Sequence, residues 1–315
     1  MVKTILEVNN LTKKYKNHMA VDHISFGIKE GEVVGLLGTN GAGKSTTINM
    51  LSTILKSDEG NIFFEGKDIK NQLSYYKKNI GVVPQEIAIY EQISVMNNVK
   101  YFCRLYGVPK KEIDQRCEKV LKAVDLYDVR ERKPSEFSGG MKRRLNIALA
   151  LLHDPKLVIF DEPTVGVDIQ SRRLILDYIK KLKQEGISVI YTTHYMEEVE
   201  EIADRIIVIK DGHIIADGDS EHIHSMLSDN VHLAITVDFI TDEIKNSLNE
   251  NINVQDIRTE NDVLYVTLKK DTSGTVYYEI IDILREECCK IKEINTVKDN
   301  FETVFLNITG ERESA

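Results

Sequence analysis

The sequence lacks any run of the roughly 18 consecutive apolar residues that a membrane-spanning helix needs. Its N-terminus also lacks the charged segment and apolar core of a secretory signal peptide. It has no heptad repeat of the kind that builds a long coiled coil. We therefore expect any role at a membrane to depend on a separate partner protein.

Cysteine is scarce, and acidic residues outnumber basic ones. None of the four cysteines, Cys103, Cys117, Cys288 and Cys289, has zinc-finger spacing, which favours reduced thiols in a cytosolic protein. The 50 acidic residues outnumber the 41 lysines and arginines and leave a net charge of −9. That balance argues against nucleic acid as the main partner, although it leaves room for a local basic face.

The 315 residues, 42 % of them hydrophobic, are enough for two domains. Short apolar runs up to residue 37 and between 60 and 84 predict strands, and helical periodicity replaces them from about 94. Strands alternate with helices again from Leu157, which predicts a largely parallel sheet covered by helices. We expect the helical stretch, about 86–153, to be an insertion into this α/β core.

A second pattern begins near Val231 and predicts a small α+β domain with ferredoxin-like topology. A further helix is predicted at 300–308. We expect a first domain over 1–229, a second over 230–315, and a hinge at the polar residues 228–230. The strands of the second domain are predicted at 231–237, 263–268 and 290–297, and its other helices at 241–249 and 277–287.

The most informative segment has the pattern G-x-x-x-x-G-K-[ST] of a phosphate-binding P-loop. Its glycines let successive backbone N–H groups point at an anion, Lys44 can reach the β- and γ-phosphates, and the Ser45 hydroxyl is placed to bind Mg²⁺. An apolar run at 32–37 precedes the loop, and apolar residues at helical spacing follow it from Ile48. The alternative is a glycine-rich turn that binds nothing, but such a turn does not require a strand before it and a helix after it. The segment reads Gly38, Thr39, Asn40, Gly41, Ala42, Gly43, Lys44, Ser45 and Thr46.

Two carboxylates, Asp161 and Glu162, follow the apolar run 157–160. An Asp at the C-terminal tip of a strand can hold Mg²⁺ beside a P-loop, and the next Glu can orient and polarise an attacking water. The alternative is a strand that runs into an ordinary polar turn. The P-loop upstream makes that alternative the weaker interpretation.

Ser138, Gly139 and Gly140 precede a segment with helical periodicity. Ser138 can cap this helix, and the two glycines can let its free N–H groups approach a phosphate closely. An ordinary N-cap with a basic first turn explains the same residues equally well. We expect the basic side chains that follow, at 142–144, to form a solvated face.

With these residues the sequence resembles the ATP-binding cassette (ABC) ATPases. The P-loop corresponds to their Walker A motif, Asp161-Glu162 to the end of Walker B, and residues 138–140 to the signature motif. Considered alone, each of the remaining matches is more typical of a surface, packing or structural residue, and only their joint order gives them weight. These matches, to the Q-loop, the D-loop, the switch histidine and the aromatic that stacks on adenine, are Gln85, Asp168, His194 and Tyr15.

The sequence departs from the family pattern at two signature positions, where Phe137 and Met141 replace the usual Leu and Gln. The Ser-Gly-Gly centre is intact, so we expect function to survive, while the hydrogen bonds of the final amide are lost. Both variants, and the segment 300–310, resemble the cassettes of drug-resistance and polymer exporters. A terminal amphipathic helix that docks on the small domain also explains that last segment.

The resemblance implies a P-loop NTPase fold, in which a mixed-sheet core carries an antiparallel β subdomain and a helical insertion. It implies ATP and Mg²⁺ as cofactors and a second cassette, in a homodimer, whose Ser138 and Gly140 close the ATP site of the first. It further implies a separate membrane permease, which places this chain at the inner, cytoplasmic face of the cell membrane. The implied catalytic residues are Lys44, Gln85, Glu162 and His194, the metal ligands are Ser45, Gln85 and Asp161, and the nucleotide-binding residues are 38–46, Tyr15, 138–140 and Asp168.

The function that we expect is an ATPase that powers export of a drug, lipid, peptide or polysaccharide through that permease. One alternative is an ABC ATPase of DNA repair or translation, but those proteins resemble tandem cassettes or carry coiled coils or basic arms. Another is a regulator that binds nucleotide without hydrolysing it. The intact Asp161, Glu162 and His194 argue against the regulator.

Overall fold

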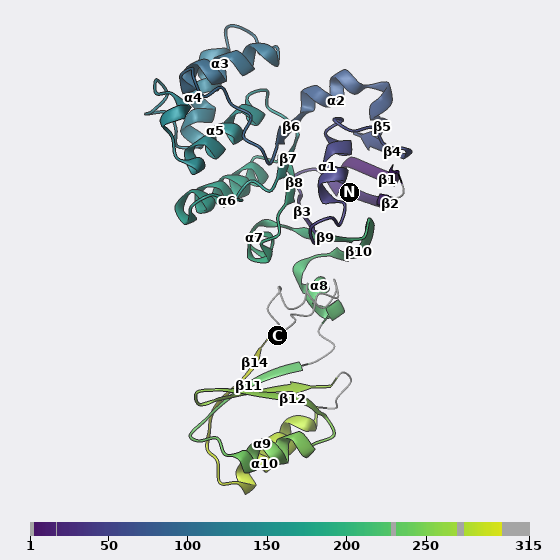
Figure 1. The fold of residues 1–315 in the computed structure, drawn as a ribbon, viewed down its shortest axis with the longest axis vertical. Coiled ribbons are helices and arrows are strands. Elements are labelled where there is room, and N and C mark those ends of the chain that lie inside the picture. Colours follow the sequence, from purple (N-terminus) through teal and green to yellow (C-terminus); the bar gives the residue numbers. More distant parts are fainter. Residues whose placement is uncertain (1–2, 17, 228–230, 270–273, 298–315) are drawn as a thin grey trace. The chain divides into compact units, whose positions relative to one another are not determined.

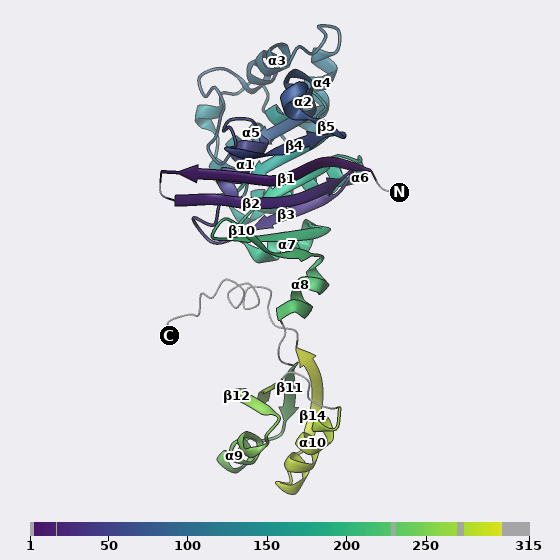
Figure 2. The same ribbon diagram turned by 90° about the vertical axis from the view of Figure 1, so that its right-hand side faces the viewer.

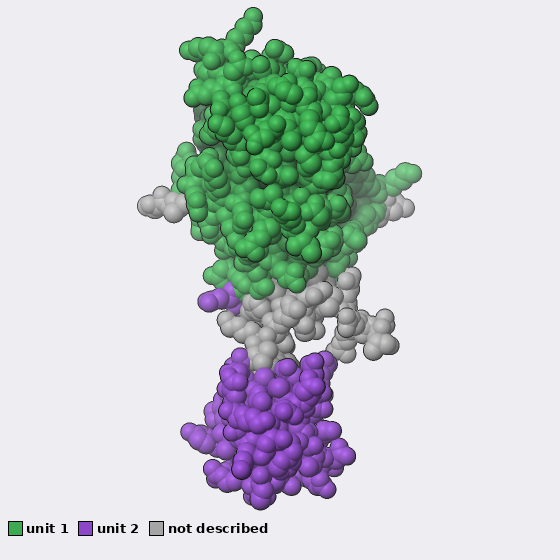
Figure 3. All heavy atoms as spheres, turned by 90° about the vertical axis from the view of Figure 1, so that its left-hand side faces the viewer, with its two compact units in different colours: residues 1–220 green, residues 221–315 purple. Residues whose placement is uncertain are grey.

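The computed structural model describes residues 3–16, 18–227, 231–269 and 274–297. The chain divides into two compact units, Met1–Ser220 and Glu221–Ala315 (Figure 3). Each unit has its own sheet structure and its own hydrophobic cluster. The predicted hinge at 228–230 and the predicted helix at 300–308 lie outside the described residues, and a domain boundary at 229/230 stays a prediction.

The first unit is built around a six-stranded sheet in the order β10-β9-β3-β8-β7-β6. Its strands pair in parallel except for β10, which pairs antiparallel with β9. Every residue of β3 and β8 is buried, as expected for a parallel sheet covered on both faces. The strands are β3 (Val33–Leu37), β6 (Ile80–Val83), β7 (Leu157–Asp161), β8 (Ser188–Thr192), β9 (Arg205–Lys210) and β10 (His213–Gly218).

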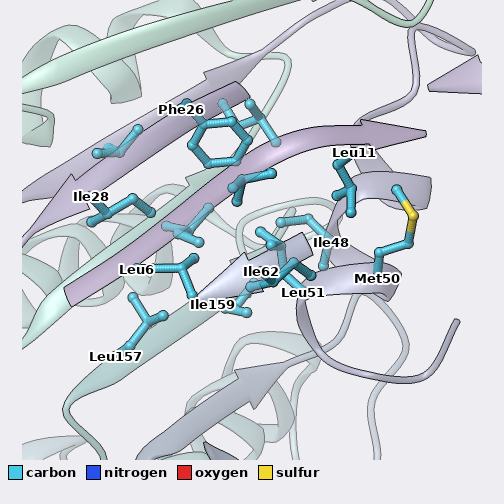
Figure 4. Close-up of a cluster of buried hydrophobic side chains, with 14 of the residues drawn as sticks. Leu6, Leu11, Phe26, Ile28, Ile48, Met50, Leu51, Ile62, Leu157 and Ile159 are labelled. Atoms are coloured by element: carbon cyan, nitrogen blue, oxygen red, sulfur yellow. The ribbon is translucent and has the colours of Figure 1, made fainter. Parts of the chain in front are cut away.

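A second, antiparallel sheet in this unit has the order β2-β1-β4-β5, with the long strands β1 and β2 side by side (Figure 2). It shares one hydrophobic cluster with helix α1 (Lys44–Leu51) and the parallel sheet, and the side chains come from β1, β2, β4, α1 and β7 (Figure 4). Because this cluster holds α1 between the two sheets, it also fixes the end of the P-loop. The strands are β1 (Thr4–Tyr15), β2 (His18–Lys29), β4 (Glu59–Phe64) and β5 (Lys67–Asp68).

Between β6 and β7 the chain forms the helical insertion that the sequence predicts (Figure 1). The side chain of Ser94 caps its first helix by accepting from the backbone N–H of Asn97. The buried residues of that helix include Val95, Val99 and Cys103, at the spacing of one helical face. The helices of this unit, besides α1, are α2 (Leu73–Asn79), α3 (Val95–Leu105), α4 (Ile113–Ala123), α5 (Gly139–Leu151), α6 (Ile169–Gln184) and α7 (Met196–Ile202).

The second unit has the element order β-α-β-β-α-β and the strand order β12-β13-β11-β14, an antiparallel sheet with ferredoxin-like connectivity. Alternate residues of β13, Leu264, Val266 and Leu268, are buried in a cluster with residues of its helices. This is the α+β arrangement that the sequence predicts. Its elements are α8 (Ser220–Leu227), which leads into it, β11 (Val231–Val237), α9 (Asp242–Glu250), β12 (Val254–Glu260), β13 (Val263–Leu268), α10 (Val276–Glu286) and β14 (Ile291–Val297).

Candidate functional site

The P-loop joins β3 to α1 and depends on glycine at several positions. Gly41 and Gly43 have φ values of 85° and 109°, in the left-handed region that side chains disfavour. A Cβ atom on Gly43 would lie 2.4 Å from the carbonyl oxygen of Ala20, and one on Gly38 would lie 2.4 Å from that of Ile209. The loop therefore packs against neighbouring backbone too closely for any other residue at these two positions.

Lys44 places its ammonium inside the loop. The residue is 6 % exposed, and Nζ donates to the carbonyl oxygens of Gly38 at 2.6 Å and Thr39 at 3.0 Å. Burial lowers the pKa of Lys44, and the nearby charges of Glu162 and Asp161 oppose that shift. The loop thus carries a desolvated cation, together with backbone donors at the N-terminus of α1, where phosphate groups bind well.

A cavity of about 350 Å³ adjoins the loop and brings together four parts of the chain that the sequence singles out separately. Besides the P-loop, Gln85 and Glu162 line it, and so does Tyr15, whose side chain is well exposed. The sequence analysis missed His18 and Ala20, which enter the lining because His18 pairs with Tyr15 across the β1–β2 hairpin. The lining residues are Tyr15, His18, Ala20, Thr39, Asn40, Gly41, Gly43, Lys44, Ser45, Thr46, Gln85 and Glu162.

Thr192, which no sequence pattern marks, binds the carboxylate of Asp161 and the backbone N–H of Glu162 at the end of β7. Its hydroxyl donates to Asp161 at 2.8 Å, and its Oγ1 and carbonyl oxygen lie 2.9 and 3.1 Å from the backbone nitrogen of Glu162. Burial is the main cause that raises the pKa of Asp161. Glu162 has a φ of 45°, and this unusual backbone conformation turns the chain sharply after the strand.

The side chains of Gln85 and His194 converge on Glu162. The amide of Gln85 donates to the Glu162 carboxylate at 3.1 Å. Nδ1 of His194 lies 3.6 Å from the same carboxylate, which is beyond hydrogen-bond distance. The geometry therefore groups a carboxylate, an amide and an imidazole beside the P-loop lysine, although His194 itself does not line the cavity among the described residues.

The signature residues lie together with the D-loop residue. Ser138 caps α5 by accepting from the N–H of Met141 at 3.2 Å, and Asp168 caps α6 by accepting from the N–H of Ser171 at 2.9 Å. A Cβ on Gly140 would lie 2.1 Å from Oγ of Ser171, so the first turns of the two helices are in direct contact. These residues do not line the nucleotide cavity of their own chain, as far as the described residues define it.

The prediction that residues 142–144 form a solvated face was wrong for the arginines. Arg143 is 4 % exposed, and its guanidinium donates to the carbonyl oxygens of Pro84 and Gln85 at 2.8 and 2.6 Å. Arg144 donates to the carbonyl of Val124 at 2.9 Å. The error arose because these partners come from distant loops whose free carbonyl groups the helical periodicity does not reveal.

Oxygen donors for a metal ion are available at this site, although they form no compact set. Ser45 lines the cavity, and Asp161 is the last residue of β7, which is separated from β3 by β8 in the sheet. Within the ranges that the structure describes, no group of three or more His, Cys, Asp and Glu side chains could hold a metal. Hydroxyl and carboxylate oxygens of this kind are the protein ligands that Mg²⁺ takes when it binds together with substrate phosphates.

A strand, a glycine loop and a helix, with a buried lysine at the loop and two carboxylates at the end of β7 in the same sheet, define a P-loop nucleotide-binding protein. The ABC transporter family model matches residues 21–165. The chain is 39 % identical to the linearmycin resistance ATP-binding protein LnrL of Bacillus subtilis, over 97 % of this chain and 98 % of that protein. It is 38 % identical to Nod factor export ATP-binding protein I of Cupriavidus metallidurans, over 68 % and 71 % of the two chains.

A solved structure gives the same result. The ATP-binding cassette MJ0796, described as a dimer in a post-hydrolysis state with ADP and phosphate, matches with a TM-score of 0.62 and 28 % identity, over 68 % of this chain and 98 % of that one. The chain belongs to the ATP-binding proteins of ABC transporters. It is thus an ATPase whose hydrolysis of ATP is coupled to transport through a separate membrane protein. In the part of the chain that the structure describes, no helix is long and apolar enough to span a membrane.

Replacing Lys44 with Ala should weaken nucleotide binding, because it removes the buried ammonium that faces the phosphates. We expect the Kd for a fluorescent ATP analogue to rise by about tenfold or more, since a hydrogen bond to a charged group contributes about 1.5–3 kcal/mol. Lys56→Ala is the control, because that lysine follows the same helix and is exposed. Equal affinities for the two variants would contradict this account of Lys44.

Proposed function

We propose that this chain is the motor subunit of an exporter, that it works as a homodimer, and that it binds Mg²⁺ together with ATP. The names of its relatives, which refer to linearmycin resistance and Nod factor export, support the outward direction of transport. The observation that carries the proposal is the nucleotide cavity, whose lining includes the P-loop, Gln85 and Glu162 but, among the described residues, neither the signature residues nor Asp168. The cassette needs a second surface to enclose a nucleotide.

The proposed residue roles follow from charge and position. The ammonium of Lys44 and the N–H groups of the loop bind the phosphates and stabilise the charge that develops on the γ-phosphoryl group. Ser45, Asp161 and Gln85 would hold Mg²⁺, which would further neutralise the phosphate charge. Tyr15 lies at the rim of the same cavity and stacks on the adenine.

Glu162 is the residue that we assign to the attacking water. Its carboxylate lies between the amide of Gln85 and the imidazole of His194, at the edge of the cavity where the phosphate chain ends. A carboxylate in this position orients a water and accepts its proton as the bond to phosphorus forms. His194 contacts the γ-phosphate from the other side of Glu162.

The second half of each site comes from the partner copy. Ser138 and Asp168 each cap a helix whose first turn presents backbone N–H groups outside the chain's own cavity. The N-terminal ends of α5 and α6 attract anions through their free N–H groups and dipoles. Head-to-tail pairing of two copies brings these turns onto the γ-phosphate that the P-loop of the facing copy holds.

The permease binds at the surface that follows Gln85. Exposed apolar side chains gather on this loop and on α3, and the side chain of Asn98, which is fully buried, exchanges hydrogen bonds of 2.8 Å with the backbone of Tyr90. Arg143 of α5 donates a hydrogen bond to the backbone carbonyl of Gln85. Movement of this surface is therefore transmitted to the nucleotide site. A permease bound at this surface would hold the chain at the cytoplasmic face of the membrane. The apolar residues are Ile87, Tyr90, Ile93, Tyr101 and Leu105.

Glu162→Gln tests the assignment of the water-activating residue. The amide keeps the size of the side chain but cannot accept a proton, so we expect the ATP turnover rate to fall by about 10²–10⁴-fold, the usual contribution of general base catalysis. The affinity for ATP should stay within about twofold, because the P-loop is unchanged. Turnover close to that of the unaltered protein would refute the role of Glu162.

A pair of differently tagged subunits tests the shared site. When one subunit carries Lys44→Ala and the other Ser138→Arg, both changes fall on the same composite site, and the second site stays intact. When a single subunit carries both changes and its partner carries none, each composite site has one defect.

We expect about half of the normal ATPase activity for the first arrangement and almost none for the second. If each chain instead used its own Ser138, the result would be reversed, and the second arrangement would retain activity. That reversal would refute the head-to-tail pairing.

A further inference from the structure

Glu198, on α7, carries a buried carboxylate that the site described above does not use. The residue is 1 % exposed. One oxygen, Oε2, accepts hydrogen bonds from three hydroxyl groups: Thr164 at 3.0 Å, Tyr191 at 2.7 Å and Thr193 at 2.8 Å. The other oxygen, Oε1, accepts from Nε of Arg172 at 2.5 Å. The charge is thus fully paired although it is removed from water, and its four partners come from three segments, since Tyr191 and Thr193 lie at the end of the same strand.

These partners lie next to the residues that we assign to hydrolysis. Thr164 follows Glu162 by two positions, and Thr193 directly precedes His194. Arg172 is on α6, one turn after the helix cap. Thr164 and Thr193 lie in loops after parallel strands, and Arg172 lies near the start of a helix. The strands bring these segments to the same edge of the sheet, but the strand hydrogen bonds do not fix them there. The carboxylate of Glu198 joins all of them at a single point.

A stack of side chains continues from this point to His194. The guanidinium of Arg172 lies over the ring of Tyr195, 4.5 Å from its centroid. The ring of Tyr195 in turn lies 4.2 Å from that of His194. The backbone N–H of Tyr195 donates to the hydroxyl of Thr193 at 3.0 Å, so the loop is held both by its backbone and by its rings.

His194 needs such support, because its own contacts are few. Its side chain is 45 % exposed, and the ion-pair distance to Glu162 is 3.6 Å. An imidazole in this setting can rotate away from the phosphate unless a neighbour restricts it. Tyr195 lies against the ring, and the position of Tyr195 depends on Arg172 and Thr193, both of which Glu198 binds.

We propose that Glu198 is a positioning residue for ATP hydrolysis, which acts by fixing His194 through Thr193 and through the Arg172–Tyr195 stack. The proposal rests on the role proposed above for His194. A carboxylate is needed because it alone can accept from three hydroxyl groups on one side and from a guanidinium on the other. Glutamine can still accept from the hydroxyl groups, but its N–H groups then face the N–H of Arg172 and release the stack.

The test is Glu198→Gln in the full chain. We expect kcat to fall by about tenfold while KM for ATP stays within about twofold, because a displaced catalytic group slows the chemical step without weakening the P-loop contacts. The matched control is Glu201→Gln. Glu201 is on the same helix and pairs with Lys180 of α6 at 2.6 Å, but this ion pair is exposed, and Lys180 lies about two turns along α6 from Arg172.

A double-mutant cycle with His194→Ala decides whether the effect passes through the histidine. We expect His194→Ala and the double variant His194→Ala, Glu198→Gln to have the same kcat. A further slowing in the double variant overturns the positioning role while leaving the role of His194 intact. If His194→Ala alone keeps full turnover, the proposed role of His194 fails, and the positioning role fails with it.

A second variant covers the case in which Glu198→Gln does not yield folded protein. Arg172→Met leaves the three hydroxyl bonds of the buried carboxylate in place and removes only the guanidinium beneath Tyr195. We expect the same fall in kcat, again absent when His194 is Ala. An unchanged kcat in Arg172→Met, with melting behaviour like that of the unaltered chain, overturns the proposal.

Discussion

The parallel register of β3, β8 and β7 is the constraint on which the site depends. Leu36 pairs with Thr192, and Thr192 pairs with Asp161, so the three strands end at one edge of the sheet. The segments that follow these strands carry Lys44, Glu162 and His194, although well over a hundred positions separate the first from the last. Their convergence follows from a buried hydrogen-bond ladder, as in other open α/β sheets whose ligands bind at the carboxyl ends of the strands.

The sequence predicted the parts of the site that a short pattern specifies. A glycine loop between an apolar strand and a helix has few other uses, and carboxylates at a strand end are visible in the chain itself. Residues whose partners come from distant backbone could not be predicted in this way. Arg143 was expected in solvent but binds the Q-loop carbonyls, and Glu198 belongs to a helix that is acidic at four of its seven positions. Only the folded chain distinguishes Glu198 from its exposed neighbours.

The two departures from the family signature are compatible with its physical parts. The cap of α5 uses the backbone N–H of Met141, which any residue other than proline supplies. Phe137 is buried, and the guanidinium of Arg132 lies 5.6 Å from the centroid of its ring. The aromatic ring therefore anchors the approach to the helix as an apolar residue should. The change affects only the side chain at position 141, where the thioether of Met141 replaces the amide of the usual Gln.

The contact between Gly140 and Ser171 has a consequence for the energetics of pairing. Since not even a methyl group fits between them, the first turns of α5 and α6 are fixed at van der Waals distance within each chain. The conformational entropy of aligning the Ser138 and Asp168 caps is therefore lost when the chain folds. In the homodimer that we propose, this part of the interface would need no further ordering when ATP joins the two copies, so more of the binding free energy would be available to hold the dimer closed.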